Sequence, residues 1–281
     1  MDDYRQPALP PPALPRYAYN SVNRCNLPPL VLGGLTFQQH PIRLQLDGIE
    51  QLHTALFRSL DGIDDAADRA ENFQDYMRSS FLLDHLDEAG LDTNRGKSRR
   101  GKADYLRVLR GWLFDADGIE GAVLKSWVES RFGLLPLNHR GPLADAESDN
   151  YRGYLAARAR GLYNANALES QLDLLYSYCQ YELRRQFAAE THLELYRGVN
   201  RIDRHQVLQQ PARNSCILVL NNISSFTGNR ERACEFGDYI LQARIPLAKL
   251  AYVPGLLPNA LKGEQEYLVI GGVYEVGMST Y

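Results

Sequence analysis

The hydrophobic pattern of this chain changes its period once, near residue 190. From about residue 42 to 190, apolar residues recur at spacings of three and four, as on one face of a helix. Beyond 190 they form short runs rich in β-branched and aromatic residues, which are typical of strands. A run of helices followed by a run of strands indicates the α+β class and argues against alternating α/β units. We therefore predict a mainly helical N-terminal region packed on a C-terminal antiparallel β core.

Four stretches of the helical region carry the repeat most clearly. The second of them contains Tyr105, Leu109 and Trp112, and we assign such aromatic and leucine stripes to the hydrophobic core. The predicted helices cover residues 65–89, 103–114, a stretch through Ile119, Val123 and Trp127, and residues 166–187.

The strands predicted after residue 190 are short and separated by glycine and proline. They are T-H-L-E-L-Y-R (191–197), S-C-I-L-V-L-N-N (215–222), D-Y-I-L-Q-A-R-I-P-L (238–247), E-Y-L-V-I (266–270) and V-Y-E-V (273–276). Gly271 and Gly272 separate the last two, and a short helical piece at 230–237 precedes the third. We divide the chain into a proline-rich leader and extended arm (1–41), a mainly helical region (42–190) and a β-rich catalytic core (191–281).

Composition excludes several classes of function. The formal net charge is -3, which gives no general reason to expect binding to nucleic acid or to a membrane surface. No run of apolar residues approaches the roughly 18 that a membrane span needs, and the acidic start M-D-D lacks the features of a signal peptide. The histidines and cysteines show no metal-ligand spacing. We expect a cytoplasmic protein without a metal in its chemistry.

Polar side chains stand at the ends of three predicted strands, in the order arginine, serine, glutamate. Arg197 is followed by a glycine, Ser225 and Thr227 follow an apolar strand, and Glu264 and Glu266 precede one. Burying such groups costs free energy unless a ligand or partner satisfies them. In an extended chain the two glutamates share one face, about 7 Å apart. The three strand ends together indicate a site.

One cation, hydroxyl groups and two carboxylates suit the cleavage of an N-glycosidic bond to ribose. That cleavage develops an oxocarbenium ion, which a fixed carboxylate stabilises. A second carboxylate can orient the incoming nucleophile, and the fork of Arg197 can hold a diphosphate by two hydrogen bonds. The hydroxyls of Ser225 and Thr227 can bond a carboxylate or a ribose hydroxyl without adding charge.

The same segments resemble the motifs of a known family. Y-R-G-V (196–199), S-S-F-T (224–227) with A-C-E-F-G (233–237), and E-Q-E-Y-L-V-I (264–270) are similar to the arginine, serine and E-x-E motifs of mono-ADP-ribosyltransferases of the arginine-serine-glutamate class. Over nearly its full length the chain resembles the branch of that family that modifies the nitrogenase iron protein. The resemblance implies an NAD cleft in the β core and an NAD-dependent transfer of ADP-ribose to a protein arginine.

The resemblance also implies a role for each motif residue. Arg197 and Gly198 would bind the phosphate and nicotinamide side of NAD, Ser225 would orient the catalytic Glu266, and Glu264 would position the acceptor arginine. Phe226 replaces a small polar residue of the family motif, so that Ser224 or Ser225 can fill the serine position. The expected NAD-binding residues are Arg197, Gly198, Ser225, Thr227 and Glu266.

Partners follow from the resemblance alone. It implies the nitrogenase iron protein (dinitrogenase reductase) as the protein substrate, which modification inactivates. It also implies a PII-type nitrogen-signalling protein as a regulator. The segment 252–262 would be the substrate-recognition loop.

Other interpretations of these residues stay open. Singly, Arg197 could form a surface ion pair, Ser225 and Thr227 could cap the 230–237 helix, and the glutamates could be solvated. The chain could instead act on another protein, hydrolyse NAD, or bind NAD without catalysis. The basic run 95–102 is either a solvated loop or a docking patch for an acidic partner.

Overall fold

The computed structural model describes residues 12–84, 104–162, 165–202, 205–258, 260–261 and 265–280, with the backbone alone at 165–167. In these ranges the helices precede a six-stranded antiparallel sheet, so the predicted α+β class is confirmed. The helices are α1 (Pro29–Leu32), α2 (Leu35–Gln39), α3 (Ile49–Leu52), α4 (Thr54–Asp61), α5 (Ala66–Ser80), α6 (Tyr105–Phe114), α7 (Ile119–Phe132), α8 (Asp149–Gly161), α9 (Ala165–Gln186) and α10 (Arg230–Cys234). The strands are β1 (His192–Val199), β2 (Gln206–Ala212), β3 (Ser215–Thr227), β4 (Tyr239–Pro246), β5 (Leu250–Tyr252) and β6 (Glu266–Thr280).

The sheet has the strand order β2-β3-β1-β4-β6-β5, with a further pairing of β3 to β6. Because β3 pairs with both β1 and β6, and β4 pairs with the same two strands, these four strands close a circuit of hydrogen bonds. The sheet therefore curls on itself. The closed part holds the first residue of β6 beside the last residue of β3, in the register Glu266↔Thr227.

The two glycines that were expected to separate two strands instead lie inside one. β6 runs continuously through Gly271 and Gly272, and β3 shifts register opposite them, between Leu220 and Ile223. A Cβ on Gly271 would lie 1.9 Å from the backbone oxygen of Asn221, and Gly272 has a φ of 123°. The glycines thus bend the strand where two backbones approach closely, which is a different use from ending it.

Differences in the helical region are mostly of length. The helix expected over 65–89 is α5, which ends at Ser80, because the chain then turns through Leu82 with a φ of 50°. Asp104 caps α6 by accepting a hydrogen bond from the backbone of Leu106. The strands β2 and β5 were not expected; the pattern of β2 is polar, since most of its side chains are exposed.

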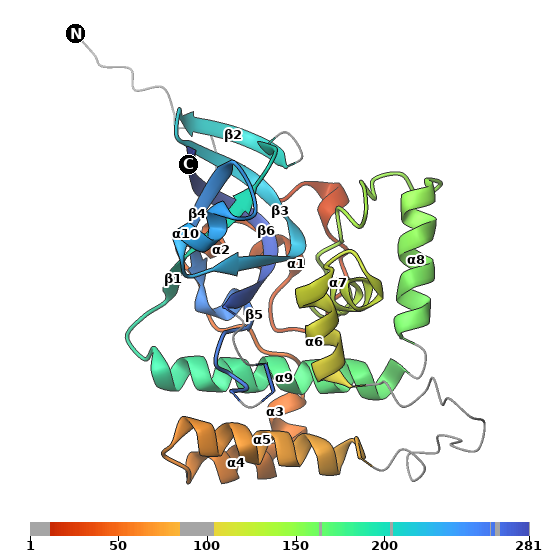
Figure 1. Ribbon diagram of the computed structural model, residues 1–281, viewed down its shortest axis with the longest axis vertical. Coiled ribbons are helices and arrows are strands. Elements are labelled where there is room, and N and C mark those ends of the chain that lie inside the picture. Colours follow the sequence, from red (N-terminus) through yellow and green to blue (C-terminus); the bar gives the residue numbers. More distant parts are fainter. Residues whose placement is uncertain are drawn as a thin grey trace.

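Helix α9 joins the two parts of the molecule. In Figure 1 it runs below the sheet, with α3, α4 and α5 beneath it, and α6, α7 and α8 stand above its right-hand part, beside the sheet. Gln180 of α9 donates to the backbone oxygens of Leu247 and Leu250 at 3.0 and 2.8 Å. On the opposite side Glu182 accepts two hydrogen bonds from the buried Arg69 of α5, at 2.7 and 2.8 Å. The larger of two hydrophobic clusters among the described residues extends through both regions.

The extended arm expected over residues 1–41 differs from the structure in its described part. Residues 12–41 contain α1 and α2 and bury Leu14, Leu32 and Phe37 in the common core. Gln38 fixes α2 to the sheet, since its side chain bonds the backbone of Arg244 and Glu275. Leu32, Leu35 and Phe37 are thus part of the fold, and α2 packs on β4 and β6. The preceding residues, 1–11, lie outside the described ranges.

Among the described residues, no helix is both long and apolar enough to cross a membrane. The same part of the chain contains no group of three or more histidine, cysteine or acidic side chains placed to hold a metal ion.

Candidate active site

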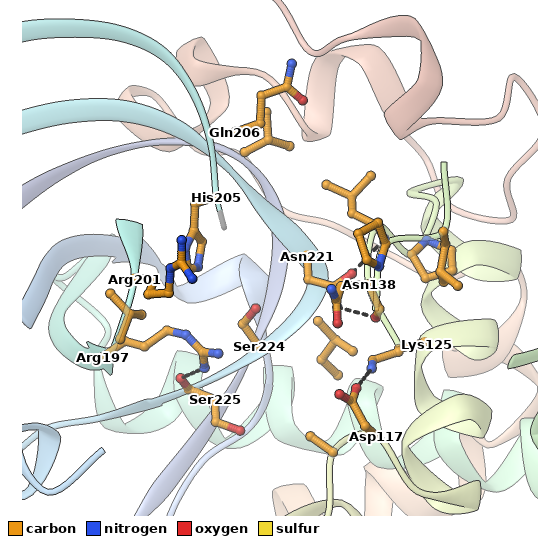
Figure 2. Close-up of a pocket in the computed structure, with 18 of the residues that line it drawn as sticks. Asp117, Lys125, Asn138, Arg197, Arg201, His205, Gln206, Asn221, Ser224 and Ser225 are labelled. Atoms are coloured by element: carbon orange, nitrogen blue, oxygen red, sulfur yellow. Dashed lines mark hydrogen bonds and ion pairs between the residues drawn. The ribbon is translucent and has the colours of Figure 1, made fainter. Parts of the chain in front are cut away.

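A cavity of about 590 Å³ lies between the sheet and the helical region. Figure 2 shows Arg197, Arg201 and His205 on one side of it, and Asp117 and Lys125 on the other. The sheet side contributes Arg197, Gly198, Arg201, His205, Ser224 and Ser225, and the helical side contributes Trp112, Asp115, Asp117, Lys125, Asn138 and Leu143. Its volume is within the range of small-molecule sites, about 300–1,000 Å³.

Arg197 lines this cavity from β1. Its Nη1 donates to the backbone oxygen of Ser225 at 2.6 Å, which joins the first two motifs. Its Nε is buried and makes no hydrogen bond to any residue that the structure describes. Burial lowers the pKa of Arg197, while the carboxylates of Glu266 and Asp117 act in the opposite direction. A buried guanidinium with an unused donor is suited to an anionic ligand such as a phosphate.

Ser225 and Glu266 meet at one indole nitrogen. The Nε1 of Trp112 donates to Ser225 Oγ at 2.9 Å and lies 3.3 Å from Glu266 Oε1. The strand register supports the arrangement, because Ser225 and Thr227 of β3 pair with Leu268 and Glu266 of β6. Glu266 itself is at the border, since the residues that line the cavity include Ser225 and Trp112 but not Glu266. The serine that shares a donor with the glutamate is thus Ser225.

Trp112 was assigned to the core by sequence, and the structure also places it at the cavity. Its side chain is 3% exposed, as a core residue would be, yet it lines the cavity and contacts two predicted site residues. A buried indole N–H usually has an acceptor, so the polar atom of the tryptophan was a signal that hydrophobic periodicity ignores.

The helical side also contains a charged cluster that sequence reasoning missed, in which Lys125 and His139 are buried and Asp117 is partly exposed. Lys125 Nζ lies 2.6 Å from Asp117 Oδ1 and 3.3 Å from His139 Nδ1. Burial lowers the pKa of Lys125, although its partner Asp117 counteracts this effect. Burial also raises the pKa of Asp117, but the hydrogen bond and charge of Lys125 outweigh it and hold that pKa below its usual value. Burial and the Lys125 charge lower the pKa of His139 to about 4, so the ring is neutral and can accept from the ammonium group.

Two predicted residues serve the packing of α10. A Cβ on Gly198 would lie 2.0 Å from the backbone oxygen of Ala233, so this glycine lets α10 approach β1. Thr227 Oγ1 accepts from the backbone nitrogen of Asn229 at 3.2 Å, and the cavity lining does not include Thr227. The side chain that caps α10 is Asn229, not Ser225 or Thr227.

Glu264 and the basic run 95–102 lie outside the described residues. The expected substrate-recognition segment 252–262 is described as far as Leu261, except Asn259. It contacts the helical region through Arg110 of α6, whose Nη2 donates to the backbone oxygen of Ala260 at 3.2 Å. α6 therefore contacts both the site and this segment.

Comparison with known proteins agrees with the motifs. The family described as "Dinitrogenase reductase ADP-ribosyltransferase (DRAT)" matches residues 22–278. A curated relative from Rhodospirillum rubrum, named NAD(+)--dinitrogen-reductase ADP-D-ribosyltransferase, is 39% identical over 263 residues, which span 92% of this chain and 95% of the relative. No solved structure matches the chain.

Proposed function

The chain belongs to the dinitrogenase reductase ADP-ribosyltransferase family, and from this premise we propose that it transfers ADP-ribose from NAD to an arginine of the nitrogenase iron protein, with Glu266 as the catalytic carboxylate. The observation that carries the proposal is that the three motifs meet beside one cavity, which Arg197 and Ser225 line and Glu266 borders. Arg197 bonds the backbone of Ser225, and Ser225 shares an indole N–H with Glu266.

NAD binding in this proposal depends on Arg197. Its buried Nε makes no hydrogen bond to any described residue, and a phosphate oxygen would satisfy it. Gly198 lies beside it on the cavity wall and offers its backbone to the nicotinamide amide. The cleft for NAD is then the space between β1, β3 and the α6–α7 wall.

The chemistry begins with the bond between C1′ of the ribose and the nicotinamide nitrogen. This bond breaks, and its electron pair neutralises the nicotinamide, which leaves. The ribose becomes an oxocarbenium ion, whose charge the carboxylate of Glu266 stabilises. A guanidinium nitrogen of the acceptor then bonds to C1′, and one proton leaves that guanidinium for solvent.

Acceptor selection falls to Glu264 in this proposal. The guanidinium of the acceptor stays protonated up to at least pH ~12, so a nearby carboxylate is needed to orient it. We expect Glu264→Gln to lose transfer to arginine while it keeps measurable NAD hydrolysis. Equal loss of both activities would remove Glu264 from this role.

The biological setting is part of the same proposal, and the resemblance to this family supports it. Modification of the iron protein inactivates nitrogenase, the protein acts in the cytoplasm, and a PII-type nitrogen-signalling protein controls it. These partners are testable by co-purification from cells grown with and without fixed nitrogen.

The deciding experiment incubates purified protein with labelled NAD and the nitrogenase iron protein, with Glu266→Gln in parallel. We expect label on an arginine of the iron protein with the wild type and almost none with the variant. Nicotinamide release without labelled protein would favour NAD hydrolysis or another target. Tight NAD binding without turnover would favour a non-catalytic regulator.

A further inference from the structure

We propose that Trp112 is a positioning residue for the catalytic glutamate, and that through it the helical region completes the active centre. This inference rests on the proposed role of Glu266. It goes beyond that role because Trp112 lies outside the three motifs, on α6, more than a hundred residues before them in the chain.

The geometry of the indole defines what it can do. An indole nitrogen is a donor only and carries one hydrogen. That hydrogen is shared between Ser225 Oγ at 2.9 Å and Glu266 Oε1 at 3.3 Å. One rigid donor therefore fixes the distance between the serine and the glutamate, and restricts the rotation of both side chains.

An uncharged hydrogen-bond donor, such as the indole N–H, is suited to the position beside Glu266. A lysine or arginine at the same position would neutralise the carboxylate, whose negative charge must remain to stabilise the oxocarbenium ion. The indole orients Glu266 without cancelling its charge. The donor is also well shielded from solvent, since Trp112 is 3% exposed.

The helical region holds the indole rigidly in turn. Lys125 Nζ lies 5.9 Å from the centre of the Trp112 ring, and Asp117 holds that ammonium group at 2.6 Å. At the other end of α6, the backbone nitrogen of Tyr105 donates to Gln171 Oε1 of α9 at 3.0 Å. The position of the donor is consequently set by α6, α7 and α9 together.

The chain supplies a matched control for Trp112. It has two tryptophans, and the second, Trp127 of α7, also donates its Nε1 to a carboxylate, Asp173 Oδ1 at 2.7 Å. Trp127 is equally buried but does not line the cavity. Replacing either tryptophan by phenylalanine removes one buried N–H that faces a carboxylate, and only one of these lies at the site.

We expect Trp112→Phe to lower kcat by about 10- to 100-fold, with the KM for NAD within about threefold, because orientation is lost and binding contacts remain. The acid limb of the pH profile of kcat for Trp112→Phe should move to higher pH, because the ionised Glu266 carboxylate loses a hydrogen-bond donor. Trp127→Phe should lower the melting temperature while the folded protein keeps kcat within about twofold. Unchanged kcat and pH profile in Trp112→Phe, or an equal loss of kcat in both variants, would overturn the proposal.

A binding measurement tests the location independently of turnover. In Trp127→Phe the one remaining tryptophan is Trp112, so titration with NAD should change its fluorescence. No change at saturating NAD, with binding shown by calorimetry, would place Trp112 away from the ligand and overturn the proposal. A wild type that binds NAD but does not turn it over counts against the proposed function instead.

Discussion

The two walls of the cavity are held in place by different forces. On the sheet side, main-chain hydrogen bonds of β1, β3 and β6 fix the positions of Arg197, Ser225 and Glu266. On the helical side, Trp112 and Lys125 are positioned by side-chain contacts, such as the pair of Lys125 with Asp117. A ladder of backbone bonds survives most side-chain replacements, whereas loss of Asp117 would leave the charge of the buried Lys125 without its partner. We therefore expect substitutions of Arg197, Ser225 and Glu266 on the sheet wall to change chemistry more than stability, and those on the helical wall to change stability as well.

The largest effect should come from the sheet wall. Glu266→Gln keeps the shape of the side chain and removes its charge, so we expect transfer to fall by about 10²- to 10³-fold. NAD affinity should stay within about threefold, and the melting temperature should not move. Glu275→Gln is the control, since Glu275 is an exposed residue of the same strand. A matching loss in the control, or a fall in NAD affinity with the loss of rate, would show that the strand as a whole had been disturbed.

The contribution of the helical wall to stability should depend on pH. Because the pKa of His139 is lowered to about 4, the unfolded chain takes up a proton before the folded protein does. The stability from neutral His139 is thus present above about pH 6.5, the usual pKa, and is lost as pH falls towards 4. Its loss amounts to about 2 kcal/mol of unfolding free energy between about pH 8 and about pH 5.

His139→Gln should show a smaller loss of stability over that range, as measured by urea unfolding. The exposed His40→Gln serves as its control. An identical pH dependence in the wild type and His139→Gln would show that the Lys125–His139 contact does not control acid stability.

A smaller effect tests the binding of NAD by Arg197. Arg197→Lys keeps the positive charge but loses the planar fork, so the contact to the Ser225 backbone and the one to a phosphate cannot both be kept. We expect NAD affinity to fall about tenfold by calorimetry, which is about 1.4 kcal/mol. Arg244→Lys, an exposed position on the neighbouring strand β4, should bind NAD normally. Wild-type affinity in Arg197→Lys would show that NAD binding does not need the planar fork of Arg197.

These contrasts also show what the sequence could reveal. Motifs of the sheet wall are local in sequence, so Arg197, Ser225 and Glu266 could be named from short segments and their order. Trp112 and Lys125 have no such signature, since each sits in an apolar helical repeat and becomes a site residue only when α6 and α7 reach the sheet. Hydrophobic periodicity does not show which distant segments of the chain come together in the fold.

Strand boundaries show the same limit within the sheet. Gly271 and Gly272 indicated a break, because glycine usually weakens a strand. Whether it ends or bends the strand depends on the backbone across the sheet, here Asn221, which lies fifty residues away. The helix–strand change near 190 was predictable because it is a change of local period, and α9 ends at Gln186 while β1 begins at His192.

The smallest effect concerns a residue at the edge of the sheet wall. Thr227 was expected to bind NAD, but its hydroxyl accepts from the backbone of Asn229, next to the cap of α10, and it does not line the cavity. Thr227→Val should therefore cost about 1 kcal/mol of unfolding free energy, the usual worth of one hydrogen bond. The KM for NAD should stay within about twofold. Thr227→Ser keeps the hydroxyl and should restore the stability. If Thr227→Val instead raised KM severalfold at unchanged stability, the NAD site would extend past the described cavity to the last residue of the serine motif, near the start of α10.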